Sequence, residues 1–156
     1  MKRALLIVAV IALAGCKSES RPPALGESIA VEQPGGSATQ LIEQGTEIPT
    51  SATEGFTTSR EDEKRIAIHV LRGSGRTAGK LRSDGWWMVD GVNPGRAGEP
   101  QIQVTFEVDG QGRLSVSARQ DDRKLKVTRV EPTDVKLKPA ALVEPGDVDE
   151  AEEDPE

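Results

Sequence analysis

Residues 100–118 read PQIQVTFEVDGQGRLSVSA, and this stretch decides the fold. From Ile102 to Val108 every second residue is apolar, an alternation that is typical of a β-strand with one buried face. The next four residues, 109–112, are Asp-Gly-Gln-Gly, and Asp and Gly tolerate the positive φ angles that tight hairpin turns need. The alternation resumes from Leu114 to Ala118, so the stretch predicts a β-hairpin.

Short apolar or alternating runs, separated by turn residues, continue this pattern on both sides of the hairpin. They lie at residues 28–32, 40–42, 48–50, 55–58, 66–71, 86–89 and 125–130. No long window between them shows a convincing helical period. The spacing predicts an all-β fold, a two-layer antiparallel β-sandwich of about eight strands.

The counts of chemically active residues exclude several functional classes. The chain has 156 residues, a formal net charge of −6, one Cys and one His. The acidic balance argues against nucleic-acid binding, which needs a basic face for the phosphates. A single Cys and a single His rule out an internal disulfide and a Cys- or His-rich metal site. His69 has no acid or nucleophile close to it in sequence, so we expect no enzyme, no metal and no other cofactor.

The N-terminus predicts export and a lipid anchor. Lys2 and Arg3 precede an apolar run, residues 4–14, which is too short to span a bilayer but fits the core of a signal peptide. Small residues before Cys16 resemble the lipobox that the lipoprotein signal peptidase cuts. We therefore expect residues 1–15 to be removed and Cys16 to carry acyl chains that hold the protein to a membrane. An ordinary cleaved signal with a chance Cys is the alternative.

Residues 16–25 are expected to form the lipidated Cys and a polar tether. Pro22-Pro23 disfavours a helix there and keeps the tether extended. Lys17 follows the Cys directly, and a basic residue at this position is consistent with sorting to the outer membrane in some bacteria. We expect a protein of the bacterial cell envelope, anchored on the periplasmic side of the outer membrane.

The acidity of the chain belongs to its C-terminal end. Residues 144–156 hold 8 acids and no base, whereas residues 17–143 hold 18 acids and 18 bases. Pro and acidic residues dominate from residue 132 onward, a composition that cannot bury enough apolar surface to fold. Residues 132–156 are therefore predicted to be a disordered, Pro-rich acidic tail, and residues 26–131 to be the folded domain.

Trp86 and Trp87 stand next to each other in a predicted strand, so their side chains point to opposite faces. Trp87 is expected to face the core, which leaves Trp86 and Met88 on the outer face. Two interpretations follow for the outer pair. Either the loop at residues 73–84 partly buries it, or it forms a second apolar contact surface.

Three segments together carry a family resemblance: LIEQGTEIPT at 41–50, IHVLRG at 68–73, and the stretch at 100–118. In this order and at this spacing they resemble the substrate-binding β-sandwich of the 70-kilodalton heat-shock chaperones, the bacterial DnaK group. The resemblance covers about residues 26–131. It implies a β-sandwich whose loops at one end form a cleft for an extended hydrophobic segment of an unfolded protein. Such a cleft uses backbone hydrogen bonds for affinity and an apolar pocket for selection.

The resemblance also implies which residues form the cleft and which arch over the peptide. The implied cleft residues are Val31, Gln33, Phe56, Ile66, Ile68 and Ile102. Pro34 and Ser59 occupy the arch positions, and Gly35-Gly36 allow the first cleft loop to turn sharply. The family's ATPase domain and helical lid are not matched in these 156 residues, and Gln44 and Gln111 are neutral where the family has charged docking residues. We therefore expect a passive holdase with no nucleotide site.

Departures from the family pattern leave a second function open. Pro34 opposite Ser59 makes a smaller and stiffer arch than the usual pair, and Ser37 replaces an apolar residue. Ile66 stands where a Val usually lines the pocket, and the extra methylene is worth about 1 kcal/mol and narrows the pocket. The alternative is a structural or partner-docking lipoprotein that has lost peptide binding.

Overall fold

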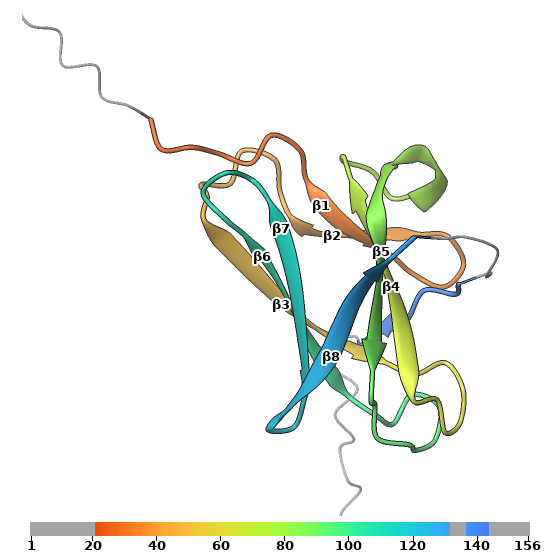
Figure 1. Ribbon diagram of the computed structural model, residues 1–156. Coiled ribbons are helices and arrows are strands. Elements are labelled where there is room, and N and C mark those ends of the chain that lie inside the picture. The colour runs from red at the N-terminus through yellow and green to blue at the C-terminus, as the bar shows by residue number, and fades with distance from the viewer. Residues whose placement is uncertain (1–20, 132–136, 144–156) are drawn as a thin grey trace, which may run out of the picture.

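Nine antiparallel strands form one continuous sheet in the computed structural model, which describes residues 21–131 and 137–143 (Figure 1). In chain order the strands are β1 (Ile29–Glu32), β2 (Ala38–Ile42), β3 (Thr50–Thr57), β4 (Arg65–Arg72), β5 (Arg82–Asp90), β6 (Ile102–Val108), β7 (Leu114–Gln120), β8 (Arg123–Val130) and β9 (Ala141–Leu142). A short 3₁₀ helix, η1, spans Ala78–Lys80. The order across the sheet is β2-β1-β4-β5-β8-β7-β6-β3-β9.

The sheet curls so that its two halves face each other as layers (Figure 1). One layer contains β1, β2, β4 and β5, and the other contains β3, β6 and β7. β8 belongs to both: Leu125 pairs with Ala118 of β7, whereas Lys126 and the residues after it pair with β5. The predicted all-β antiparallel sandwich is confirmed, and its layers are two halves of one sheet.

The β6–β7 hairpin has the register that the alternation predicts. Phe106 lies opposite Val116, and Val108 lies opposite Leu114 across the turn. The apolar residues of β6 are 0–1% exposed, while the residues between them face outward. The Asp109 carboxylate accepts hydrogen bonds from the Gln111 and Arg113 amides, and the Arg113 Nε donates to it at 2.7 Å. These bonds from Arg113 lower the pKa of Asp109 from its usual 3.8.

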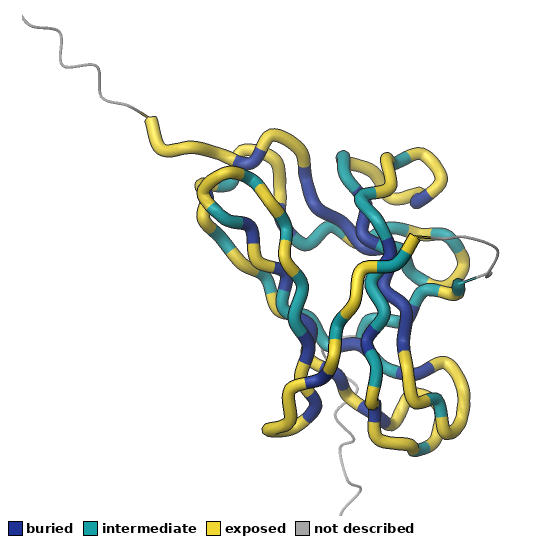
Figure 2. The backbone as a smooth tube through the Cα atoms, viewed as in Figure 1, coloured by how far each residue is buried: buried dark blue, intermediate teal, exposed yellow. Residues whose placement is uncertain are grey.

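One apolar core fills the space between the layers, as the buried inner faces of the strands indicate (Figure 2). The Phe56 and Phe106 rings meet in it with centroids 6.2 Å apart and planes tilted by 53°. A smaller cluster of Ala30, Leu71 and Ala78 lies under the loop that contains η1. The main core therefore joins the two layers, whereas the smaller cluster joins η1 to β1 and β4.

The C-terminal part of the chain differs from the prediction. Residues 137–143 were expected within a disordered tail, yet Leu137–Val143 is an extended segment that contains β9. Its partners are strand edges that composition alone does not reveal. The predicted signal peptide, Cys16 and the acidic residues 144–156 lie outside the described residues. In the part of the chain that is described, no helix is long and apolar enough to cross a membrane.

Candidate functional site

Five of the predicted cleft residues form an apolar floor. They are Val31 on β1, Phe56 on β3, Ile66 and Ile68 on β4, and Ile102 on β6. All five are at most 3% exposed and belong to the same core cluster. They come from both layers, because β1 and β4 lie in one and β3 and β6 in the other. The structure therefore brings these residues, from four strands, into one core cluster.

Above this floor lies a gap between the edges of β3 and β4. β1 pairs with β4 only at residues 70–72, so the first half of β4 lacks a strand partner on that side. β3 pairs with β6 along one edge, and its other edge faces the gap. Unpaired backbone edges readily accept an additional extended chain. The gap is thus suited to hold a peptide in the β conformation.

The chain's own residues 139–143 occupy this gap, and we call them the resident segment. Phe56 and Thr57 of β3 pair with Leu142 and Ala141 in an antiparallel ladder. On the other side, Ala67 of β4 forms a parallel bridge with Pro139. The cleft that the resemblance implies is therefore filled from within the chain, where the blue segment runs beside the orange loop after β1 (Figure 1).

Three amides of the resident segment donate hydrogen bonds to three different walls of the gap. The Ala140 N–H bonds the Ala67 carbonyl oxygen at 2.8 Å, and the Val143 N–H bonds the Gly55 carbonyl oxygen at 2.8 Å. The Leu142 N–H bonds Oε1 of Gln33 at 2.9 Å. The Ala140 side chain is 5% exposed and joins the core cluster. Recognition of the segment thus combines backbone bonds with one deeply buried side chain.

The two loops that flank the gap carry the predicted arch residues. Pro34 and Ser59 are both exposed, and the arch between them stays a prediction. The first loop turns at Gly35 and Gly36, whose φ angles are +92° and +83°, a region that side chains with a Cβ rarely adopt. The Ser59 amide donates to Oε2 of Glu63 at 3.1 Å, which fixes the second loop.

Two polar groups near the resident segment are buried without a hydrogen-bond partner among the described residues. They are Nε2 of Gln33 and Oγ1 of Thr57. Gln33 and Thr57 contact the segment through their other polar groups or their backbone. Buried polar groups are normally paired, so each of these leaves unused binding capacity. The site can therefore form more hydrogen bonds than the resident segment provides.

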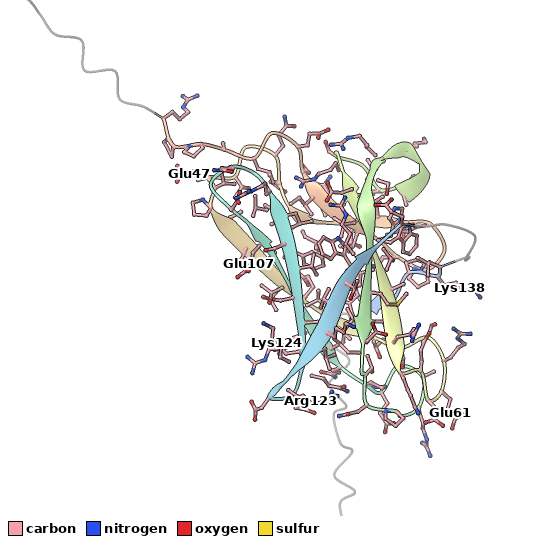
Figure 3. The ribbon with its side chains drawn as sticks, viewed as in Figure 1. Glu47, Glu61, Glu107, Arg123, Lys124 and Lys138 are labelled. Carbon is pink, nitrogen blue, oxygen red and sulfur yellow. The ribbon has the colours of Figure 1, made fainter. Side chains whose placement is uncertain are left out.

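The entrance to the gap carries an excess of basic side chains. A hollow of about 270 Å³ beside it is lined by Arg60, Glu63, Arg65, Ala67, Met88, Leu137 and Lys138. Arg60 pairs with Glu63 at 3.2 Å, and Lys138 points outward from the segment (Figure 3). Arg65 pairs with Asp90, outside this lining, at 3.4 Å, so three bases and one acid line the hollow.

The structure gives His69 neighbours that are distant from it in sequence. Nδ1 of His69 lies 2.5 Å from Oε2 of Glu32, and Nε2 lies 2.8 Å from Oγ of Ser83. The Trp86 ring stacks on the imidazole at 4.2 Å with an angle of 4° between the planes. An acid and a hydroxyl therefore do flank His69. Sequence proximity missed them because they come from β1 and β5, 37 and 14 residues away.

The stacking on His69 also bears on whether the outer Trp86 is buried or forms an apolar contact surface. Trp86 is 9% exposed, so it is buried rather than part of an apolar contact surface. Trp87 packs against the core, and the Arg129 guanidinium lies 5.8 Å from the centre of its ring. Within residues 21–131 and 137–143, no group of three or more His, Cys, Asp or Glu is placed to hold a metal ion.

Comparison with protein-family models agrees with this geometry. The model described as "Hsp70 protein" matches residues 25–152, which include every strand from β1 to β9 and the whole gap with its resident segment. The match covers more than half of the chain, and the all-β sandwich fits the family's substrate-binding domain. The chain belongs to the Hsp70 protein family.

Proposed function

We propose that this domain binds extended, hydrophobic segments of unfolded proteins and holds them passively, without chemistry on the bound chain. The observation that carries the proposal is the gap between β3 and β4, in which an extended backbone donates hydrogen bonds to the carbonyl oxygens of Gly55 and Ala67 and to Oε1 of Gln33. Backbone bonds of this kind tolerate many sequences, and the apolar floor selects for at least one apolar side chain. Membership of the Hsp70 family supports the same role.

The passive character rests on the loops where the family docks its ATPase domain. Gln44 and Gln111 occupy those positions in this chain, and both are neutral and exposed. The Gln44 amide bonds Oγ of Ser28 at 2.9 Å, which keeps its loop against β1. Neutral side chains supply no ion pair to a docking partner. Binding and release would then follow the affinity of the cleft alone, in the µM range or weaker, about −8 kcal/mol at best.

Titration of the full chain with a labelled, leucine-rich heptapeptide tests this function. We expect saturable binding by fluorescence anisotropy, and no binding of a heptapeptide in which Ser replaces each Leu. A leucine-rich peptide methylated at alternate backbone nitrogens is the matched control, because it keeps the side chains but lacks the N–H groups. It should bind at least tenfold more weakly. Equal affinity for the methylated peptide, or no binding at millimolar concentration, contradicts the proposal.

We also propose that Cys16 anchors the domain to a membrane of the bacterial envelope, with the outer membrane favoured by Lys17. The basic start of the chain, the apolar run and the small residues before Cys16 support it. Expressed in a bacterium grown with labelled palmitate, the chain should take up label and lose residues 1–15, and Cys16→Ser should do neither. Label in Cys16→Ser equal to that in the parent chain would rule out the lipid anchor at this residue.

A further inference from the structure

We propose that residues 139–143 are an intramolecular competitor: the resident segment holds the cleft closed to other peptides, which must displace it in order to bind. The part of this inference that concerns displacement rests on the proposed peptide-binding function. The part that concerns occupancy rests on the contacts of the segment alone. These contacts use the same backbone groups that an incoming extended chain would need.

Mutual exclusion follows from the hydrogen bonds. The carbonyl oxygens of Gly55 and Ala67 each accept from an amide of the segment, and the ladder occupies the edge of β3 at Phe56 and Thr57. A Cβ at Gly55 would lie 3.4 Å from Cβ of Val143, so the segment packs directly onto the strand. A second extended chain cannot occupy the same edge while the segment is in place.

The chemistry of the segment is that of the proposed ligands. Residues 139–143 read PAALV, an uncharged apolar run between Lys138 and Glu144. Ala140 fills the most buried position, and Leu142 packs against the core cluster. Only five residues separate Glu131, just after β8, from Leu137. A tether this short gives an effective concentration of about 1 mM, well above that of most free peptides.

Other features of the segment make it replaceable. Its strand, β9, has only two residues, and Pro139 has no N–H to donate. Nε2 of Gln33 and Oγ1 of Thr57 remain without partners while the segment is bound. A foreign peptide that pairs with these groups gains bonds that the resident segment lacks. The resident segment therefore binds the cleft tightly enough to compete with another peptide, yet weakly enough to be displaced by it.

Competition by the resident segment lowers the apparent affinity of the cleft for other peptides. For a segment with an intrinsic dissociation constant of about 0.1 mM and an effective concentration of about 1 mM, the cleft is free about a tenth of the time. The apparent affinity for another peptide is lowered by that fraction. Freeing the cleft should therefore raise the affinity for the labelled heptapeptide about tenfold.

Two variants of the full chain separate the segment from the cleft walls. Ala140→Asp places a carboxylate where the buried methyl group lies, and Leu142→Pro removes the amide that bonds Gln33. Both leave every residue of the floor unchanged. Each should bind the heptapeptide about tenfold more tightly than the parent chain, with an unchanged circular dichroism spectrum. Lys138→Ala, at an exposed position of the same stretch, is the control and should leave the affinity unchanged (Figure 3).

Amide hydrogen exchange tests occupancy without any added peptide. The amides of Ala140, Leu142 and Val143 should be protected in the parent chain, independently of protein concentration, and should lose protection when saturating heptapeptide is added. Exchange at the rate of a free chain overturns the inference, as does protection that rises with concentration, because the occupant would then come from a second copy. Unchanged peptide affinity in both folded variants also overturns it.

The two proposals fail in different ways. If these three amides are protected but neither the parent nor the variants bind peptide, the peptide-binding function is wrong and the occupancy stands. If the parent and variants bind peptide equally well and the amides are unprotected, the function stands and the competitor is wrong.

Discussion

Replacing Phe106 by alanine should destabilise the domain by about 3–5 kcal/mol, the usual cost of removing a buried aromatic ring. Phe106 is fully buried between the layers and its ring packs against that of Phe56. The cavity would open where both layers meet, so neither layer can collapse onto it alone. A domain of this size is stable by only about 5–15 kcal/mol, so the loss is a large part of the total.

Urea denaturation followed by Trp fluorescence measures this loss. Phe106→Leu keeps most of the volume and should cost only about 1 kcal/mol. Glu107→Ala changes the next residue of β6, which is exposed, and should stay within about 0.5 kcal/mol of the parent (Figure 3). A Phe106→Ala midpoint no lower than that of Glu107→Ala would show that the core does not depend on this ring.

Replacing Ile66 by phenylalanine should abolish peptide binding. Ile66 is 3% exposed on the floor of the cleft, in the same apolar cluster as Ala140. The larger ring has no free space in the core and must extend into the position that Ala140 or the central side chain of a peptide occupies. Overpacking of this kind typically costs about 1–3 kcal/mol of stability, so the domain should remain folded. We expect no saturation with the heptapeptide, together with loss of protection at the Ala140 amide.

Ile66→Val is the matched control for this change. It removes one methylene, widens the pocket and should preserve or strengthen binding of a leucine-rich peptide. If folded Ile66→Phe binds the heptapeptide as tightly as the parent chain, the cleft is not the binding site. If the chain captures a single folded partner, and Ile66→Phe does not change that capture, the structural or docking role is favoured. The departures from the family pattern at Pro34, Ser37 and Ser59 are the reason for considering that role.

The strands that follow local rules could be predicted from the sequence. The alternation from Ile102 to Val108 and the Asp-Gly turn fixed the β6–β7 hairpin, because side-chain burial and turn geometry are decided by adjacent residues. β9 could not be predicted in this way. A two-residue strand in a Pro-rich, acidic stretch has no periodicity, and its conformation comes from the exposed edge of β3 at Phe56 and Thr57. Only the three-dimensional arrangement reveals that edge.

The candidate site shows the same division. The family pattern selected residues that the structure places in one core cluster, among them Val31, Phe56 and Ile102. The neighbours of His69 were missed, since Glu32 and Ser83 reach it only through the register of β1 and β5 with β4. Pairing across strands depends on the register between distant segments, and this register cannot be derived from a single sequence.

The shared strand β8 limits how the domain can move. The first part of β8 pairs with β7 and the rest pairs with β5. The two layers therefore cannot separate as rigid bodies without breaking the hydrogen bonds of β8. Unfolding should therefore be cooperative across both layers, with no separately stable half. If the domain binds peptides as proposed, access to the cleft comes instead from its rim: the resident segment and the loops that carry Pro34 and Ser59. Ligand exchange would then be a local opening of the rim while the rest of the domain stays rigid.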